Sequence, residues 1–272
     1  MSFPKVPTAR SFDPSKPAYT SSGGHWYDRE GRPQYTVIAK GTGQPRPATL
    51  ADARKHGWVP GVTTIINMES APALTEWKVN QAIMAALTLP VIEGESLEDR
   101  KVRVLKDSIE QTETAKNTGT AIHNAIERAF LTGKVEQLPE FVQPVIDWLA
   151  KEFPGVLFEP EASFAHYRGY GCKIDLVSKD KSIVLDFKTK SFRSSDPPKQ
   201  FAYSQQAMQL WANARAAGNK DAGKFNLFIS TEEPGLLSPH EWPSRSKQEL
   251  EAFDLLLELW KIRRNYDTGW KE

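Results

Sequence analysis

The sequence of 272 residues contains a single cysteine, Cys172. One thiol cannot form an internal disulfide, and it cannot supply the cysteine cluster of a structural zinc site or an iron–sulfur cluster. No apolar run approaches the roughly 20 residues that a membrane helix needs, and the first residues lack the apolar core of a signal peptide. We therefore expect a cytoplasmic protein with no membrane partner and no iron–sulfur cluster.

A strong excess of either charge is also missing, since 35 Lys and Arg face 34 Asp and Glu for a net charge of +1. Proteins that coat nucleic acid without sequence preference are usually far more basic. A DNA enzyme is still compatible with this balance, because acidic metal ligands cancel nearby Lys and Arg. Residues 173–200, for example, hold seven basic and four acidic side chains.

The hydrophobic pattern predicts an irregular N-terminal arm over residues 1–60, rich in Pro, Gly and polar residues, followed by one domain over 61–272. The arm includes a short predicted strand at 34–39. Helical periodicity covers 74–87, 98–132, 140–153, 200–217 and 247–264, and strand patterns cover 157–165, 172–177, 182–188 and 224–230. This order predicts an α/β fold with a central mixed β-sheet flanked by helices.

Two carboxylates and a lysine lie on the consecutive predicted strands 172–177 and 182–188, as Asp175, Asp186 and Lys188. Residues i and i+2 of a strand share a face, so Asp186 and Lys188 point the same way. Carboxylates on adjacent strands suit Mg²⁺ or Mn²⁺, and a lysine beside them can orient a water and meet the charge on a phosphate. A solvated hairpin with a cross-strand ion pair explains the spacing equally well.

A second set of polar residues follows the period of the predicted helix 98–132. Gly119, His123 and Glu127 are spaced by four residues, so they share one helical face. A histidine there is a candidate metal ligand or general acid/base. The alternative is a half-buried histidine that hydrogen-bonds to the backbone.

Taken in order, these motifs resemble the RecB-like branch of the PD-(D/E)xK nucleases, which includes many phage exonucleases. The series is Gly-xxx-His-xxx-Glu on a helix, then Glu161, an Asp after a Gly-rich turn, Asp-x-Lys, and a helix with Gln and Tyr. The resemblance covers about residues 50–265 and implies a restriction-endonuclease-like core. One departure is Cys172, which stands where the family usually has a glycine.

The resemblance implies a role for each matching residue. Mg²⁺ or Mn²⁺ would be bound by His123, Asp175, Asp186 and the backbone carbonyl of Phe187. Lys188 would position the attacking water, and Glu127 or Glu161 would bind a second metal or brace the site. The family's Gln-xxx-Tyr motif, which holds the lysine and the DNA backbone, is predicted at Gln205 or Gln206 with Tyr203 nearby.

Other side chains are candidates for DNA contacts. Lys190, Arg193 and Lys199 follow the second strand and would hold phosphates, unless they belong to an ordinary solvated loop. Tyr170 is expected to line a substrate path. Aromatic residues of the arm, Trp26 and Tyr27 among them, suit base stacking, but we favour a role as anchors of the arm.

The predicted function is a Mg²⁺- or Mn²⁺-dependent DNA exonuclease of phage recombination or replication, acting in the host cytoplasm. Its partners would be DNA and a recombination or single-strand-binding protein. Two alternatives stay open at this point. One is a DNA endonuclease of the same fold, and the other is a non-catalytic DNA-binding or partner-binding protein.

Overall fold

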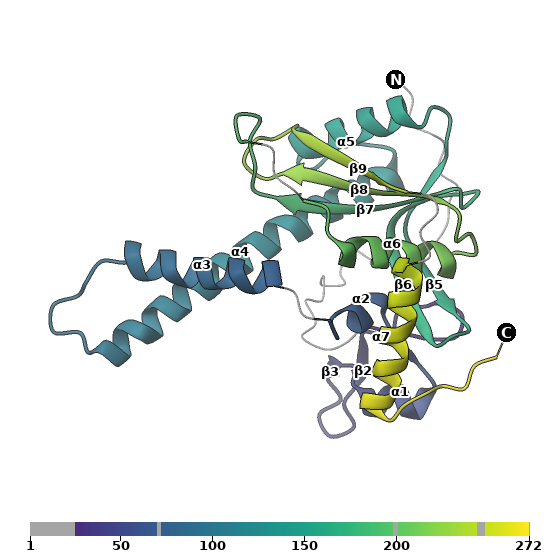
Figure 1. Cartoon of the computed structure of the whole chain (residues 1–272), viewed down its shortest axis with the longest axis horizontal. Coiled ribbons are helices and arrows are strands. Elements are labelled where there is room, and N and C mark those ends of the chain that lie inside the picture. Colours follow the sequence, from purple (N-terminus) through teal and green to yellow (C-terminus); the bar gives the residue numbers. More distant parts are fainter. Residues whose placement is uncertain (1–24, 70–71, 198–200, 244–247, 272) are drawn as a thin grey trace. The chain divides into compact units, whose positions relative to one another are not determined.

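The computed structural model describes residues 25–69, 72–197, 201–243 and 248–271 (Figure 1). The chain forms two compact units, one of residues 1–68 and 125–272 and the other of residues 69–124. The described residues 25–68 group with the sheet, and the predicted division of the chain at residue 60 stays a prediction. Helix α4 (Leu97–Thr132) begins in the second unit and ends in the first.

A five-stranded mixed sheet forms the centre of the first unit (Figure 1). Its strands, in spatial order, are β5 (Phe158–His166), β6 (Tyr170–Ser178), β7 (Ile183–Lys190), β8 (Gly223–Ser230) and β9 (Leu237–Trp242). Only β7 and β8 pair in parallel, and helix α6 (Ser204–Ala216) connects them. The predicted α/β class with a mixed sheet and flanking helices is confirmed.

A polar turn fixes the register of the β6–β7 hairpin. The Asp180 carboxylate accepts hydrogen bonds from the backbone N–H of Ser182, at 3.0 Å, and from the Ser178 hydroxyl. Lys181 adopts a positive φ of 62°, as a tight turn requires. This turn sets Val177 opposite Val184 and Leu176 opposite Leu185. The next positions along the hairpin carry the two aspartates.

Helices cover both faces of the sheet. Phe153, at the end of α5 (Pro139–Glu152), packs its ring 5.1 Å from the ring of Phe225 in β8. Asn226, the next residue of β8, faces the opposite way because strand side chains alternate. That opposite face is covered by α6, and α6 packs in turn against α7 (Gln248–Arg264). Polar side chains of β7 and β8 that face α6 are therefore removed from water.

The N-terminal segment adds short elements to the sheet unit. They are β1 (Trp26–Tyr27), β2 (Thr36–Ile38), β3 (Pro45–Pro47), α1 (Leu50–His56), β4 (Val59–Pro60) and α2 (Val62–Ile66). Trp26 and Tyr27 are buried, so both act as anchors of this segment. The Tyr27 ring lies directly over Gly171 of β6, where a methyl group would come within 2.4 Å of it.

The second unit consists of α3 (Pro72–Thr88) and the first part of α4. In the described part of the chain, no helix is both long enough and apolar enough to span a bilayer.

Candidate functional site

The site begins where β6 and β7 separate. Asp175 of β6 follows the last paired positions of the hairpin, and its carboxylate accepts a hydrogen bond of 2.8 Å from the backbone N–H of Phe187. A side-chain oxygen thus takes the place of a backbone acceptor at this point. The contact holds Asp175 against β7, next to Asp186.

Asp186 is buried, and both of its carboxylate oxygens accept hydrogen bonds. Its Oδ1 accepts hydrogen bonds from Nζ of Lys188 and Nε2 of Gln209, each 2.8 Å long. Its Oδ2 accepts a hydrogen bond of 2.7 Å from Nδ2 of Asn226 and also lies 2.7 Å from the Lys188 amine. A buried carboxylate is costly without such donors. Three elements, β7, α6 and β8, therefore cooperate to hold this one group.

Lys188 carries the positive charge of the site. Burial opposes that charge, but the neighbouring carboxylates of Asp186 and Asp175 outweigh it and raise the pKa of the amine above its usual value. The amine also lies 3.5 Å from the Oε1 atom of Gln209. Lys188 is therefore a permanent cation near neutral pH, beside two carboxylates.

Two glutamates lie near Asp175. Burial raises the pKa of Glu127, and the charge of Asp175 raises it further, against the opposing effect of Lys173. Glu161 of β5 forms an ion pair with Lys173. The register of the β5–β6 ladder on either side, with Pro160 opposite Leu176 and Ala162 opposite Ile174, sets Glu161 level with Asp175.

The chemistry of these donors fits a divalent cation. Hard carboxylate oxygens from Asp175, Asp186 and Glu127 are ligands that Mg²⁺ and Mn²⁺ prefer. Burial is the main reason for the raised pKa of Glu127, and the nearby charge of Asp175 adds to it. Within the described residues, no three His, Cys, Asp or Glu side chains converge as a ready ligand set, and in this structure Asp186 is engaged by Lys188 and two amides.

Two further predicted ligands are His123 and Phe187. His123 belongs to the other compact unit, and its role as a ligand stays a prediction. Phe187 buries its ring and gives its N–H to Asp175. The predicted use of its carbonyl as a ligand stays a prediction as well.

Gln209, one helical turn beyond Gln205, reaches the site and contacts Asp186 and Lys188, and the predicted role of Gln205 stays a prediction. Gln206 instead accepts a hydrogen bond of 3.0 Å from the backbone N–H of Tyr203, at the start of α6. Tyr203 itself is exposed. Gln209 lies between the buried Met208 and Leu210. The sequence signal that could have identified it is a polar residue within an otherwise inward-facing helical turn.

Asn226 and Trp242 were not predicted at the site. Asn226 pairs with Asp186 in the parallel register of β7 and β8, and its Oδ1 accepts a hydrogen bond of 2.8 Å from the indole N–H of Trp242. The sequence signal for Asn226 was an amide between the apolar residues Phe225 and Leu227 of a predicted strand. The result is a continuous chain of hydrogen bonds from Trp242 through Asn226 to Asp186.

The residues predicted to contact DNA differ in burial and in their contacts. Lys190 lies on the same face of β7 as Lys188; burial and the charge of Lys188 both lower the pKa of its amine. Tyr170 is fully buried, with its hydroxyl hydrogen-bonded to the Ala212 carbonyl and to Arg215. It offers no surface to DNA, which corrects the prediction that it lines a substrate path. Lys199 lies outside the described residues.

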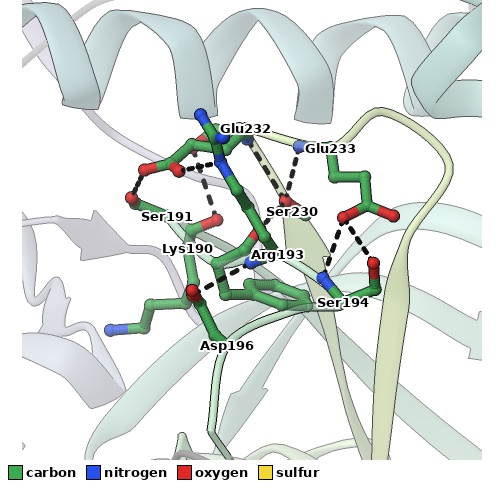
Figure 2. A network of polar contacts seen from close by, with 10 residues as sticks. Lys190, Ser191, Arg193, Ser194, Asp196, Ser230, Glu232 and Glu233 are labelled. Carbon is green, nitrogen blue, oxygen red and sulfur yellow. Dashed lines mark hydrogen bonds and ion pairs between the residues drawn. The ribbon is translucent and has the colours of Figure 1, made fainter.

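Arg193 belongs to a network between the loops that follow β7 and β8 (Figure 2). Its Nε atom lies 2.9 Å from the Glu232 carboxylate, which also accepts a hydrogen bond from Ser191. The backbone N–H and the hydroxyl of Ser194 both donate to Glu233, at 2.8 and 2.9 Å. We name these contacts the loop clasp. A phosphate contact by Arg193 stays a prediction, and it would compete with Glu232.

Comparison with known proteins adds little. No family model and no curated protein matches the sequence. Among solved structures, one titled "Crystal structure of SSO0001" aligns with a TM-score of 0.34 and 15% identity, over 71% of this chain and 88% of the other. A likeness this slight carries no argument about fold or function.

Proposed function

We propose that this chain is a Mg²⁺- or Mn²⁺-dependent deoxyribonuclease of the PD-(D/E)xK superfamily, in its RecB-like branch. The observation that carries the proposal is the placement of Asp175 and Asp186 side by side at the opening of the β6–β7 hairpin, with the Lys188 amine on Asp186. These are the residues of the Asp…Asp-x-Lys pattern, and they meet at one point of the fold.

Each side chain has a definite task in this proposal. Asp175, Asp186 and Glu127 would hold the ion, which would supply Lewis-acid activation of water and offset charge on the phosphate. The positively charged Lys188 amine would stabilise the negative charge that develops on the scissile phosphate. Gln209 contacts both Asp186 and Lys188 and fixes their separation. Lys190, on the same face, adds a second positive charge for the DNA backbone.

The preference for DNA ends, the setting in phage recombination or replication and the host cytoplasm rest on the resemblance described in the sequence analysis. A recombination or single-strand-binding protein is the corresponding partner. These parts of the proposal depend on the nuclease activity and are tested after it.

The direct test is incubation of the purified chain with linear and circular DNA in Mg²⁺, Mn²⁺ or EDTA. We expect loss of linear DNA alone, with either metal and not with EDTA. Lys188→Ala is expected to abolish cleavage while the protein stays folded. Cutting of circles would assign an endonuclease of the same fold. Binding of DNA without cleavage in either metal would reject the enzyme and favour a non-catalytic DNA-binding protein.

A further inference from the structure

Asn226 is the most deeply buried of the partners of Asp186. It has no exposed surface, and its Nδ2 atom lies 2.7 Å from Oδ2 of Asp186. The parallel ladder places the two residues directly opposite each other in β7 and β8. The contact is therefore set by strand register, and it holds Oδ2, the oxygen that also lies 2.7 Å from the Lys188 amine.

The orientation of the Asn226 amide follows from Trp242. An indole N–H only donates, so the group that faces it across 2.8 Å must be the oxygen of the amide. With the oxygen turned to Trp242, the NH₂ group points to Asp186. Without the indole donor, only the hydrogen bond to Asp186 orients the amide, so Asn226 is held less firmly behind the carboxylate.

We infer that Asn226 and Trp242 are positioning residues for Asp186, with Trp242 acting through Asn226. This inference rests on the proposed function, because its purpose is to hold Asp186 as a metal ligand. Partners behind a ligating carboxylate fix its direction, and loss of one such partner typically weakens metal binding about 10- to 100-fold. Neither residue needs to touch the metal or the DNA.

A purely structural role for Trp242 makes a different prediction. Its ring also packs against the core, so its loss costs stability whether or not Asn226 is present. The positioning role requires the two residues to depend on each other, which a double-mutant cycle measures. Trp242→Phe keeps most of the ring and removes the donor. Trp148→Phe in α5 is the matched control, since Trp148 is also half-buried and packs against Phe153.

The experiment measures the dissociation constant for Mn²⁺ by electron paramagnetic resonance, without DNA, on the full chain. We expect Trp242→Phe to weaken Mn²⁺ binding about 10-fold and Asn226→Ala about 10- to 100-fold. The double variant should bind no more weakly than Asn226→Ala, and Trp148→Phe should bind like the wild type. Thermal unfolding without metal reports whether each variant is folded.

Unchanged Mn²⁺ binding in Trp242→Phe overturns the inference, and so does a double variant in which the two losses add. If Asn226→Ala fails to fold, the comparison of Trp242→Phe with Trp148→Phe decides alone. Wild-type protein that neither binds Mn²⁺ nor cleaves DNA rejects the proposed function, and this inference with it. A wild type that cleaves, with Trp242→Phe unaffected, rejects only the inference.

Discussion

The Gln209 side chain links the Asp186 carboxylate to the Lys188 amine, because its amide NH₂ donates to Asp186 and its oxygen lies 3.5 Å from the amine. Gln209→Leu keeps the side-chain volume and removes both contacts. We expect DNA cleavage to fall about 10- to 100-fold with little loss of stability, as for other partners of a metal ligand. Initial rates on end-labelled DNA measure this effect.

A matched control for that substitution is Gln143→Leu, on the exposed side of α5, where the Gln143 amide donates a hydrogen bond of 2.8 Å to Asp147. Its cleavage rate should equal that of the wild type. Equal rates for Gln209→Leu and the wild type would contradict the role given to Gln209.

His166 gives a prediction about pH. Burial, followed by the charges of Arg215 and Arg168, lowers the pKa of its imidazole from 6.5 to about 4. Between these values the unfolded chain binds a proton that the folded protein does not, so stability falls as the pH drops from about 6.5 to about 4. The full shift is worth about 3 kcal/mol, and solvent screening of a half-buried ring reduces this to about 1–2 kcal/mol.

The variant that isolates this effect is His166→Gln, which has no proton to gain. Urea unfolding at pH 7, 5.5 and 4.5 measures the free energy of unfolding of both proteins. We expect the wild type to lose about 1–2 kcal/mol more than the variant between pH 7 and 4.5. Parallel losses in the two proteins would refute the assignment.

Contacts between site residues could be predicted where the residues are close in the sequence. Asp186 and Lys188 are two positions apart on one strand, so their common face follows from the strand period alone. Gln209 and Asn226 reach the same carboxylate from α6 and β8. Their approach depends on the parallel pairing of β7 with β8 and on the rotation of a helix about its axis, and neither is encoded in local spacing.

At the scale of elements, the close contact between β1 and β6 gives a further prediction. A side chain at Gly171 would place its Cβ 2.4 Å from Cγ of the buried Tyr27, so one of the two must shift. Gly171→Ala should therefore destabilise the protein by about 1–3 kcal/mol through overpacking. Chemical denaturation measures the change.

Two further variants test the origin of that loss. Gly41→Ala is the control, because a Cβ at Gly41 meets no atom within 4 Å. Tyr27→Ala should destabilise the wild type but cost much less in the Gly171→Ala background, where it removes the clash. Additive losses in the double variant would show that the two residues do not compete for the same space.

Long, strongly periodic elements were predicted well. Most short ones were not, although the strand predicted at 34–39 is present as β2, Thr36–Ile38. The helix expected at 98–132 is α4, Leu97–Thr132. Strand β9 was missed, because Pro239 interrupts it and its residues are only partly buried. It is an edge strand, where proline is tolerated. Helices α1 and α2, of seven and five residues, are too short for their periodicity to show.

At the scale of the whole molecule, the two compact units differ in how much they bury. Over residues 75–124 the buried residues are Ala85, Ser108 and Ile122, whereas the last turns of α4 bury Ala125, Ile126, Ala129 and Phe130 within eight residues. Segments with few buried apolar side chains open more readily than those in a core. One continuous helix should therefore differ in stability along its length.

Hydrogen–deuterium exchange read by mass spectrometry measures that difference. We expect backbone amides of residues 100–118 to exchange at least about tenfold faster than those of residues 125–132, which corresponds to about 1.4 kcal/mol in local stability. Uniform protection along α4 would contradict this expectation.

The loop clasp has a consequence for any nucleic acid that reaches Arg193. Glu232 already serves this guanidinium as a counter-ion, and it is tethered to the protein. A phosphate that binds there must exchange with a carboxylate that cannot diffuse away, so the usual entropy gain from released salt is missing at this position. Arg193 would then contact DNA by exchanging Glu232 for a phosphate, so its contribution to DNA affinity would depend little on ionic strength. Release of Glu232 would also loosen the turn after β8.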